Sequence, residues 1–228
     1  MLRLFTHILL YLHRIIDLGM EQLKQFGIIP IDFNVLSSTL ESYRSIADKV
    51  YRLEKDGSLI RLKKGMFVVS PTITHQTLSR ELISNHLYGP SYISLESALS
   101  FYKLIPEQVY TVRSVTTKRA HKFRNEIGNF EYITVPETYY SIGIRQEIVS
   151  NQYAYLIATP EKALCDIIMA TRGFRIQSVR AMRLFLEQDL RIDFSVINTF
   201  DLDIIKNCAS TGKKVNELNF LLKILENE

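Results

Sequence analysis

Residues 32–69 read DFNVLSSTLESYRSIADKVYRLEKDGSLIRLKKGMFVV, and their pattern predicts two helices followed by a basic hairpin. Asp32 is a typical N-cap residue, so we expect a short helix from Phe33 to Leu40. Ser42 opens the next helix, and Gly57 ends it. Its buried stripe, with a period of about 3.6 residues, is expected to consist of Ile46, Ala47, Val50, Tyr51 and Leu53–Glu54. The hydrophobic pattern then changes to that of short strands.

The two strands and a preceding helix complete the expected N-terminal domain. Strands at Leu59–Leu62 and Met66–Val69 are joined by a tight turn with Gly65 at its tip. Upstream, an amphipathic helix runs to about Phe26, and Pro30 prevents its continuation. Three helices followed by a hairpin are the order of a winged helix-turn-helix, in which the third helix enters the DNA major groove.

Positive charge is concentrated on the third helix and the hairpin. From Tyr43 to Gly65 there are seven Lys or Arg residues and three acids, an excess equal to the +4 of the whole chain. The predicted DNA-binding residues are Tyr43, Arg44, Ser45, Lys49, Arg52, Arg61, Lys63 and Lys64. Two alternatives stay open: the helix face is simply solvated, or the winged helix makes only protein contacts.

The rest of the chain predicts a second, larger domain. A helical connection begins at Thr72, and extended runs rich in β-branched residues follow at Val109–Thr117, Phe130–Val135, Tyr140–Arg145, Gln146–Val149 and Tyr153–Ala158. The helices expected after them are Pro160–Thr171, Ser178–Gln188, a short one near Ser195–Asn207, and Val215–Leu225, with no strand–helix–strand alternation. This order favours an α+β fold with a mostly antiparallel sheet and C-terminal helices. We therefore expect residues 1–75 to form the N-terminal helix and the winged helix, and residues 76–228 the α+β domain.

A second basic stretch lies in this larger domain, at the end of one predicted strand and in the loop after it. Its cations are Arg113, Lys118, Arg119, Lys122 and Arg124, and no acid lies among them. Five uncompensated cations would repel one another unless they are solvated or face an anion. The stretch is therefore either a solvated loop, or a second nucleic-acid surface or docking site for an anionic partner.

No catalytic or metal-binding motif stands out. The segment from Thr159 to Asp166 imitates one, but Thr159 and Pro160 are typical of a helix start and Glu161 complements the helix dipole. The two acids there are about 140° apart around the helix, a poor arrangement for paired acid–base chemistry. We expect no catalytic residue, no metal and no cofactor, and two reduced core cysteines, Cys165 and Cys208.

The composition is that of a globular protein, with 46% hydrophobic and 23% charged residues, and the pI near 9.0 permits a nucleic-acid partner. The apolar run near the N-terminus, Leu4–Leu12, is too short to span a membrane. Histidines and Arg14 interrupt it, and no signal-peptide cleavage site follows. These features predict a cytoplasmic protein with no membrane partner.

Four segments, in this order, resemble the abortive-infection E-type antitoxins (AbiEi family) of type IV toxin–antitoxin systems. They are YRLEKDGSLIRLKKGMFVVSP (51–71), GPSYISLESALSFYKLIPEQV (89–109), YTVRSVTTKRAHKF (110–123) and YLIATPEKALCDII (155–168). The resemblance covers about residues 32–171 and brings no catalytic machinery. The segment 1–19 carries little of it.

This resemblance implies a DNA-binding antitoxin that binds inverted repeats of double-stranded operator DNA and represses its own operon. It also implies that the chain neutralises a nucleotidyltransferase toxin, and that this neutralisation does not require a stable complex between the two proteins. The stretch Arg113–Arg124 matches the position where the family's C-terminal domain presents positive charge to DNA. The alternatives are a stand-alone winged-helix regulator whose C-terminal domain senses a ligand or oligomerises, and an enzyme acting on nucleic acid through Glu161 or Asp166.

Overall fold

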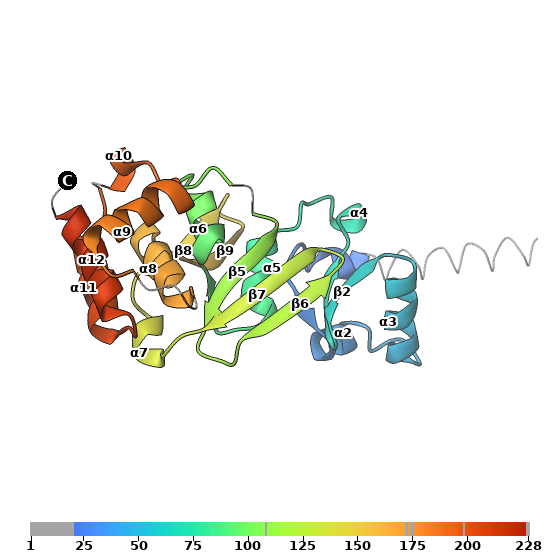
Figure 1. The fold of residues 1–228 in the computed structure, drawn as a ribbon. Helices are drawn as coiled ribbons and strands as arrows, with labels where there is room; N and C mark the ends of the chain where they lie inside the picture. The colour runs from blue at the N-terminus through green and yellow to red at the C-terminus, as the bar shows by residue number, and fades with distance from the viewer. Residues whose placement is uncertain (1–20, 108, 172, 174–175, 198, 227–228) are drawn as a thin grey trace, which may run out of the picture. The chain divides into compact units, whose positions relative to one another are not determined.

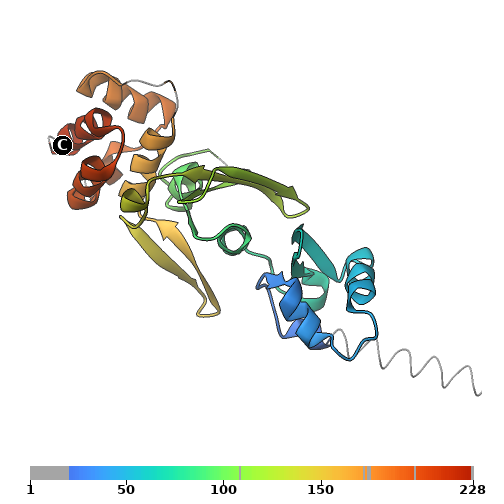
Figure 2. The same cartoon turned by 90° about the horizontal axis from the view of Figure 1, so that it is seen from below.

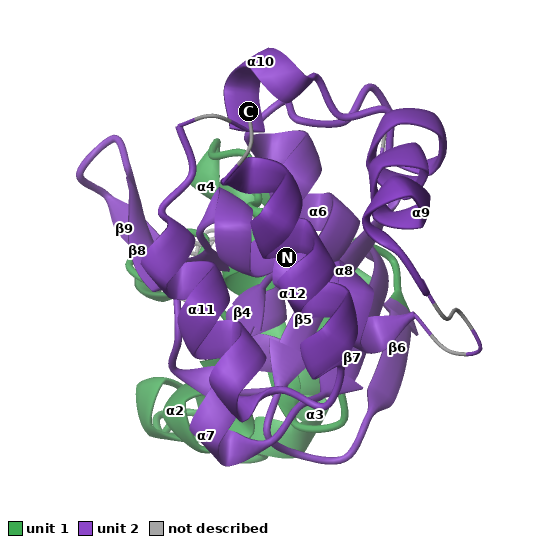
Figure 3. Cartoon of the chain, turned by 60° about the vertical axis from the view of Figure 1, so that its left-hand side comes forward, with its two compact units in different colours: residues 1–83, 125–127 green, residues 84–124, 128–228 purple. Residues whose placement is uncertain are grey.

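The computed structural model describes residues 21–107, 109–171, 173, 176–197 and 199–226 (Figure 1). The chain forms two compact units, shown in different colours in Figure 3. Unit 1 comprises the chain up to Ile83 together with Asn125–Ile127, and unit 2 comprises Ser84–Arg124 and Gly128–Glu228. The predicted N-terminal helix lies mostly in residues 1–20, outside the described residues, and only its end at residues 21–24 is described as helical.

Unit 1 combines short helices with a small antiparallel sheet. Its elements are β1 (Ile31–Asp32), α2 (Phe33–Thr39), α3 (Ile46–Lys55), β2 (Leu59–Lys63), β3 (Met66–Val69) and α4 (Pro71–Thr74). The strand order is β1-β3-β2, and both pairings are antiparallel. The predicted helix Phe33–Leu40 and both hairpin strands are confirmed to within one residue, whereas the two-residue strand β1 was not predicted.

The core of unit 1 is built from the apolar faces of these elements. Leu36 of α2, Val50 and Leu53 of α3, and Phe67 and Val69 of β3 belong to one cluster of buried side chains. At the hairpin tip, Gly65 has φ +77, a left-handed conformation that costs glycine little, and this conformation allows the tight turn that the sequence predicts. Val50 and Leu53 fix which face of α3 is buried, and so which face is exposed.

Unit 2 contains a six-stranded sheet and most of the helices. Its strands are β4 (Ser91–Ile93), β5 (Thr111–Thr116), β6 (His121–Asn125), β7 (Gly128–Thr134), β8 (Ile144–Val149) and β9 (Tyr153–Ala158). Its helices are α6 (Leu95–Phe101), α7 (Glu137–Tyr140), α8 (Pro160–Ala170), α9 (Val179–Leu184), the π-helical turn η1 (Phe185–Asp189), α10 (Phe194–Ile197), α11 (Leu202–Thr211) and α12 (Val215–Leu225). Helix α5 (Arg80–Leu87) leads from unit 1 into unit 2.

The α+β class is confirmed, and the expectation of a mostly antiparallel sheet holds only in part. The strand order is β6-β7-β5-β4-β9-β8, and the sheet is mixed. Strand β7 returns from β6 and lies between β6 and β5, where it runs parallel to β5, and β4 is parallel to β9. Local hydrophobic patterns mark the strands but do not determine which strands become neighbours, so the parallel pairs were missed.

Two other local predictions are corrected. The stretch after Arg113 was expected to be a loop, but its second half forms β6, a strand at the edge of the sheet. The strand predicted at Tyr140–Arg145 is instead the end of α7 and the start of β8. Aromatic and β-branched residues are common in strands, so Tyr139 and Tyr140 imitated a strand that the chain does not form.

The helices of unit 2 pack in layers, with α6 and α8 next to the sheet and α9, α11 and α12 beyond α8 (Figures 1 and 2). Gly143, which has φ +59, lies where the chain approaches α8 closely. A Cβ atom there would lie 2.8 Å from the Cβ of Lys162 and 2.9 Å from Cγ2 of Ile204. Glycine is therefore required at this position for both its conformation and its size.

Candidate nucleic-acid interface

Helix α3 has one buried and one exposed face. Val50 and Leu53 are buried, and the exposed residues within the helix are Ala47, Asp48, Tyr51, Arg52 and Lys55. At about 100° per residue, Asp48 and Lys55 point almost directly away from the buried side chains. Tyr51 is 58% exposed and lies between them. This face combines two cations, the acid Asp48 and an aromatic ring, and it is open to solvent within unit 1.

The assignment of Tyr51 and Ala47 to the buried stripe is wrong. Both side chains are exposed, because the direction of the buried face is set by Val50, Leu53 and the partly buried Ile46. Tyr51 is about 100° from Val50 and 160° from Leu53 around the helix. A helical projection centred on Val50 and Leu53 would have identified it from the sequence.

The helix begins at Ile46 and not after Ser42. Ser45 is the N-cap, and its hydroxyl oxygen accepts a hydrogen bond of 3.4 Å from the backbone N–H of Asp48. Ser42 and Ser45 are both N-cap residue types, so the sequence alone did not distinguish the two starts. The structure therefore assigns Ser45 a role in starting the helix, while Arg44 just before it is exposed.

Two of the predicted contact residues lie at the edge of the buried face. The ring of Tyr43 packs against the core of unit 1, and the Lys49 ammonium lies 4.7 Å from the centre of that ring. Both side chains are half-buried. Arg52, by contrast, is exposed on the outward side of α3. The cations best placed to meet a partner are therefore Arg44, Arg52 and Lys55.

The hairpin cations differ in how they are compensated. The Arg61 guanidinium makes a two-pronged contact with Glu54 of α3, with 2.7 Å between Nε and Oε1. The hydrogen bonds from Arg61 lower the pKa of the Glu54 carboxyl and the same contact raises the pKa of Arg61, so both groups stay charged. Lys63 is half-buried and Lys64, at the turn, is exposed. Arg61 thus ties the hairpin to α3 with its charge already neutralised.

The second basic stretch crosses β5, a turn and β6, and acids from neighbouring elements compensate part of it. Arg113 of β5 forms ion pairs with Glu96 of α6 and with Glu131 of β7, 3.2 Å from its Nε. Lys122 of β6 binds the same Glu131 at 2.7 Å. The expectation of five uncompensated cations is therefore wrong, because the acids that pair with them lie on other elements. Hydrogen bonds from Lys122 and the charge of Arg113 lower the pKa of the Glu131 carboxyl.

The other three cations of the stretch are exposed. The Lys118 ammonium donates to the carbonyl oxygen of Gly89 and lies 5.5 Å from the centre of the Tyr88 ring. Arg119 and Arg124 are exposed side chains at either end of the turn and strand that carry them. Beside this stretch lies a cavity of about 600 Å³, lined among others by Arg113, Lys122 and Glu131 of the sheet and by Met169 at the end of α8. The charged residues that line this cavity, Arg113, Lys122 and Glu131, are therefore the ones that neutralise one another.

The helix that imitates a catalytic motif holds a buried ion pair. Lys162 and Asp166 of α8 are 0% and 1% exposed, with 3.3 Å between Nζ and Oδ1. The other carboxylate oxygen, Oδ2, accepts hydrogen bonds from the hydroxyls of Tyr92 (3.0 Å) and Ser94 (2.5 Å), and Lys162 donates to the carbonyl oxygen of Tyr139. These contacts join α8 to β4 and α7. Lys162 was not singled out in the sequence, where a lysine at the start of a helix resembles a solvated one.

The sequence also raised the questions of a metal site, a membrane-spanning helix and the state of the two cysteines. Within the described part of the chain, no group of three or more His, Cys, Asp or Glu side chains is arranged to hold a metal ion. Among the same residues, no helix has the length and apolar character needed to cross a membrane. Cys165 and Cys208 are buried and unbridged, and burial raises the pKa of the Cys165 thiol. These thiols are core residues, as predicted.

Comparison of the sequence with protein-family models gives no match, and comparison with curated proteins gives no match either.

Proposed function

We propose that unit 1 is a winged helix-turn-helix that binds double-stranded DNA. In this proposal α3 enters the major groove and the β2–β3 hairpin is the wing that lies along the backbone. The observation that carries it is the outward face of α3, where Tyr51, Arg52 and Lys55 are exposed while Val50 and Leu53 hold the helix in the core. The hairpin that follows presents Lys64 at its turn.

The geometry also supports a division of roles among the predicted DNA-binding residues. Arg44 and Arg52 contribute uncompensated charge to the groove-facing side, and Ser45 acts by starting the helix. Lys49 is held near the Tyr43 ring at the edge of the face, which suits contact with a phosphate better than with a base. Arg61 contributes little attraction because Glu54 neutralises it.

DNA binding is tested by fluorescence anisotropy with a duplex taken from the region upstream of the chain's own gene. The variant Arg44→Ala/Arg52→Ala is expected to lower the slope of log affinity against log salt by about two units. Arg180→Ala/Lys206→Ala removes two exposed charges from α9 and α11 in unit 2 and serves as the matched control. Unchanged binding by the Arg44/Arg52 variant would contradict the proposal.

On the resemblance to the AbiEi family, we further propose that the chain is an antitoxin that represses its own operon. It would act in the cytoplasm and counteract a nucleotidyltransferase toxin encoded next to it. This counteraction would not require a stable complex between the two proteins. The test is co-expression with the product of the adjacent gene, with growth as the readout. Growth arrest that the chain does not relieve would refute the antitoxin role, while DNA binding would stand or fall on the measurement above.

We propose no enzymatic activity for the chain. The side chains of Glu161 and Asp166 are engaged in structural contacts: Glu161 accepts a hydrogen bond of 3.1 Å from the backbone N–H of Asp201, and Asp166 is paired with Lys162. Glu161→Gln keeps the acceptor and removes the charge, so it is expected to leave growth rescue unchanged. Loss of rescue by a variant that still folds would instead favour a catalytic carboxylate.

A further inference from the structure

Strand β6 reads His121-Lys122-Phe123-Arg124-Asn125 and has two chemically different faces. Side chains alternate across a strand, so His121 and Phe123 share one face while Lys122 and Arg124 share the other. The contacts agree: Lys122 pairs with Glu131, whereas His121 and Phe123 contact aromatic rings. The strand lies at the edge of the sheet, beyond β7.

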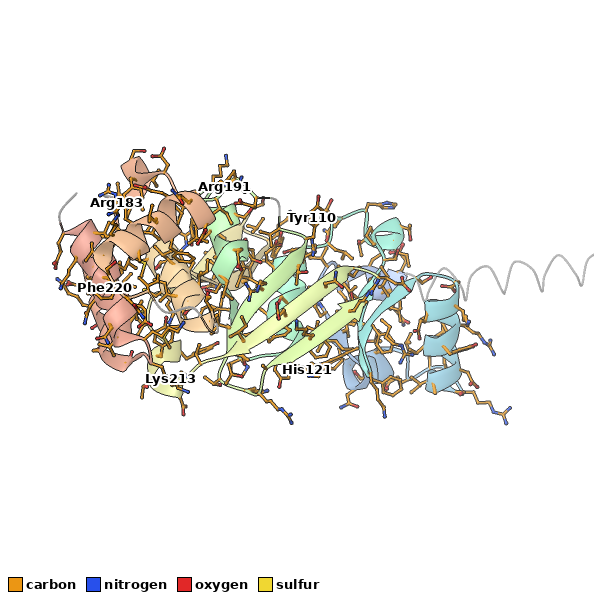
Figure 4. The ribbon with its side chains drawn as sticks, in the orientation of Figure 1. Tyr110, His121, Arg183, Arg191, Lys213 and Phe220 are labelled. Carbon is orange, nitrogen blue, oxygen red and sulfur yellow. The ribbon has the colours of Figure 1, made fainter. Side chains whose placement is uncertain are left out.

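The aromatic face of β6 is part of a cluster of four rings. The His121 ring stacks on Tyr88 at 5.5 Å between centres with 29° between planes, and Phe123 lies 4.4 Å from His121. Tyr132 of β7 contacts both Tyr88 and Phe123 edge-on. Tyr132 is buried, Tyr88 and Phe123 are half-buried, and His121 is exposed. Figure 4 labels His121 on β6. The cluster is thus anchored at its base and open at His121.

Two cations, Lys118 and Arg119, lie on the turn that contacts these rings. The turn before β6 is held by three hydrogen bonds: Tyr88 Oη donates to the carbonyl oxygen of Arg119 (3.1 Å), Thr134 Oγ1 donates to that of Lys118 (2.8 Å), and the backbone N–H of Lys118 donates to Thr116 Oγ1 (3.2 Å). The Lys118 ammonium lies over Tyr88. Arg113 and Lys122 are neutralised by acids, and Arg124 lies on the other face of β6 with Lys122. The positive charge beside the rings therefore comes from Lys118 and Arg119.

We propose that this surface binds single-stranded nucleic acid, with a base stacked on His121 and Phe123 and the backbone phosphates near Lys118 and Arg119. Aromatic rings on an open sheet, bordered by cations, are a common way to bind single strands, because every unpaired base has a face to stack. In a duplex the bases are stacked on one another and cannot reach the rings. The proposed activity resides in unit 2 and is independent of duplex binding by unit 1.

The test measures binding of the full chain to a labelled unstructured oligoribonucleotide, the matching oligodeoxynucleotide, a duplex and an abasic oligomer of the same length. His121→Ala/Phe123→Leu removes both rings while keeping apolar volume at the half-buried position. It is expected to weaken single-strand binding by about tenfold or more. Lys118→Ala/Arg119→Ala is expected to lower the salt slope by about 0.7 per cation. The ratio of ribo- to deoxyribo-oligomer affinity shows which sugar is preferred, and either preference supports the proposal.

Matched controls separate stacking from charge and from misfolding. Tyr110→Ala removes another exposed aromatic ring of unit 2, and Lys122→Ala removes the neutralised cation on the opposite face of β6; both are expected to bind as the parent does. Arg44→Ala/Arg52→Ala is expected to weaken duplex binding and to leave single-strand binding unchanged. Equal affinity for intact and abasic oligomers, or parental binding by a folded His121/Phe123 variant, would overturn the proposal. His121→Ala alone, at an exposed position, repeats the test if the double variant does not fold.

Discussion

The cations of α3 and those of β5 and β6 look alike in the sequence but differ in what lies opposite them. Arg52 and Lys55 are exposed on α3, and neither forms an ion pair with an acid of the described residues. Arg113 and Lys122 share Glu131, which lies on β7 and is 9 residues away from Lys122 in the chain. A run of positive charge therefore indicates a binding surface only after the acids of neighbouring strands and helices have been taken into account.

The extreme case of a compensated cation is Lys162, and its removal is expected to have the largest effect. Lys162→Met leaves Asp166 as a buried, unpaired carboxylate and should lower the free energy of unfolding by about 3–5 kcal/mol. Chemical denaturation measures this loss. Lys162→Met/Asp166→Asn keeps acceptors for Tyr92 and Ser94 without an unpaired charge, so it should recover part of the stability. A double variant no more stable than Lys162→Met would show that the pair itself is not the cause.

The comparison predicts opposite results for two variants with the same change in net charge. Arg52→Ala/Lys55→Ala should reduce the salt slope of duplex binding by about two units, and its stability should stay within about 0.5 kcal/mol of the parent. Arg113→Ala/Lys122→Ala should leave duplex binding nearly unchanged and lower the free energy of unfolding by about 1 kcal/mol. Anisotropy and denaturation on both variants test this, and equal losses of duplex affinity would break the comparison.

These differences show what the sequence could and could not predict. Strands β3 and β9 and helix α12 were predicted with their observed bounds, because their apolar patterns and the turn residues beside them are local signals. The edge strand β6 was missed because charged residues alternate with His121 and Phe123, and such a pattern lacks a continuous apolar face. The partners of Arg113 and Lys162 were missed because they come from other elements.

Acid titration distinguishes the compensated surface from the exposed one. The pKa of Glu131 is lowered in the folded chain by Lys122 and Arg113, so its contribution to stability is present above the unfolded value of about 4.5. That contribution is lost as pH falls below 4.5 and through the lower folded pKa. Glu131→Gln should therefore flatten the pH dependence of stability below pH 4.5, measured by thermal unfolding from pH 3 to 6. An unchanged profile would mean that other carboxyl groups cause the pH dependence of stability in this range.

The smallest expected effect is also the most specific to the proposed interface, and it concerns Glu54. Because Glu54 neutralises Arg61, Glu54→Gln should free one cation of the hairpin while keeping a side chain of the same shape. Duplex affinity should then rise, and the salt slope should increase by up to about one unit if the freed guanidinium reaches a phosphate. The loss of an exposed ion pair should cost about 0.2–1 kcal/mol of stability. Arg61→Ala is the matched control, since it breaks the same ion pair but frees the Glu54 carboxylate in place of a cation, so its affinity should fall below that of the parent. If both variants bound the duplex equally, the hairpin would lie away from the DNA, and the interface would be reduced to the outward face of α3.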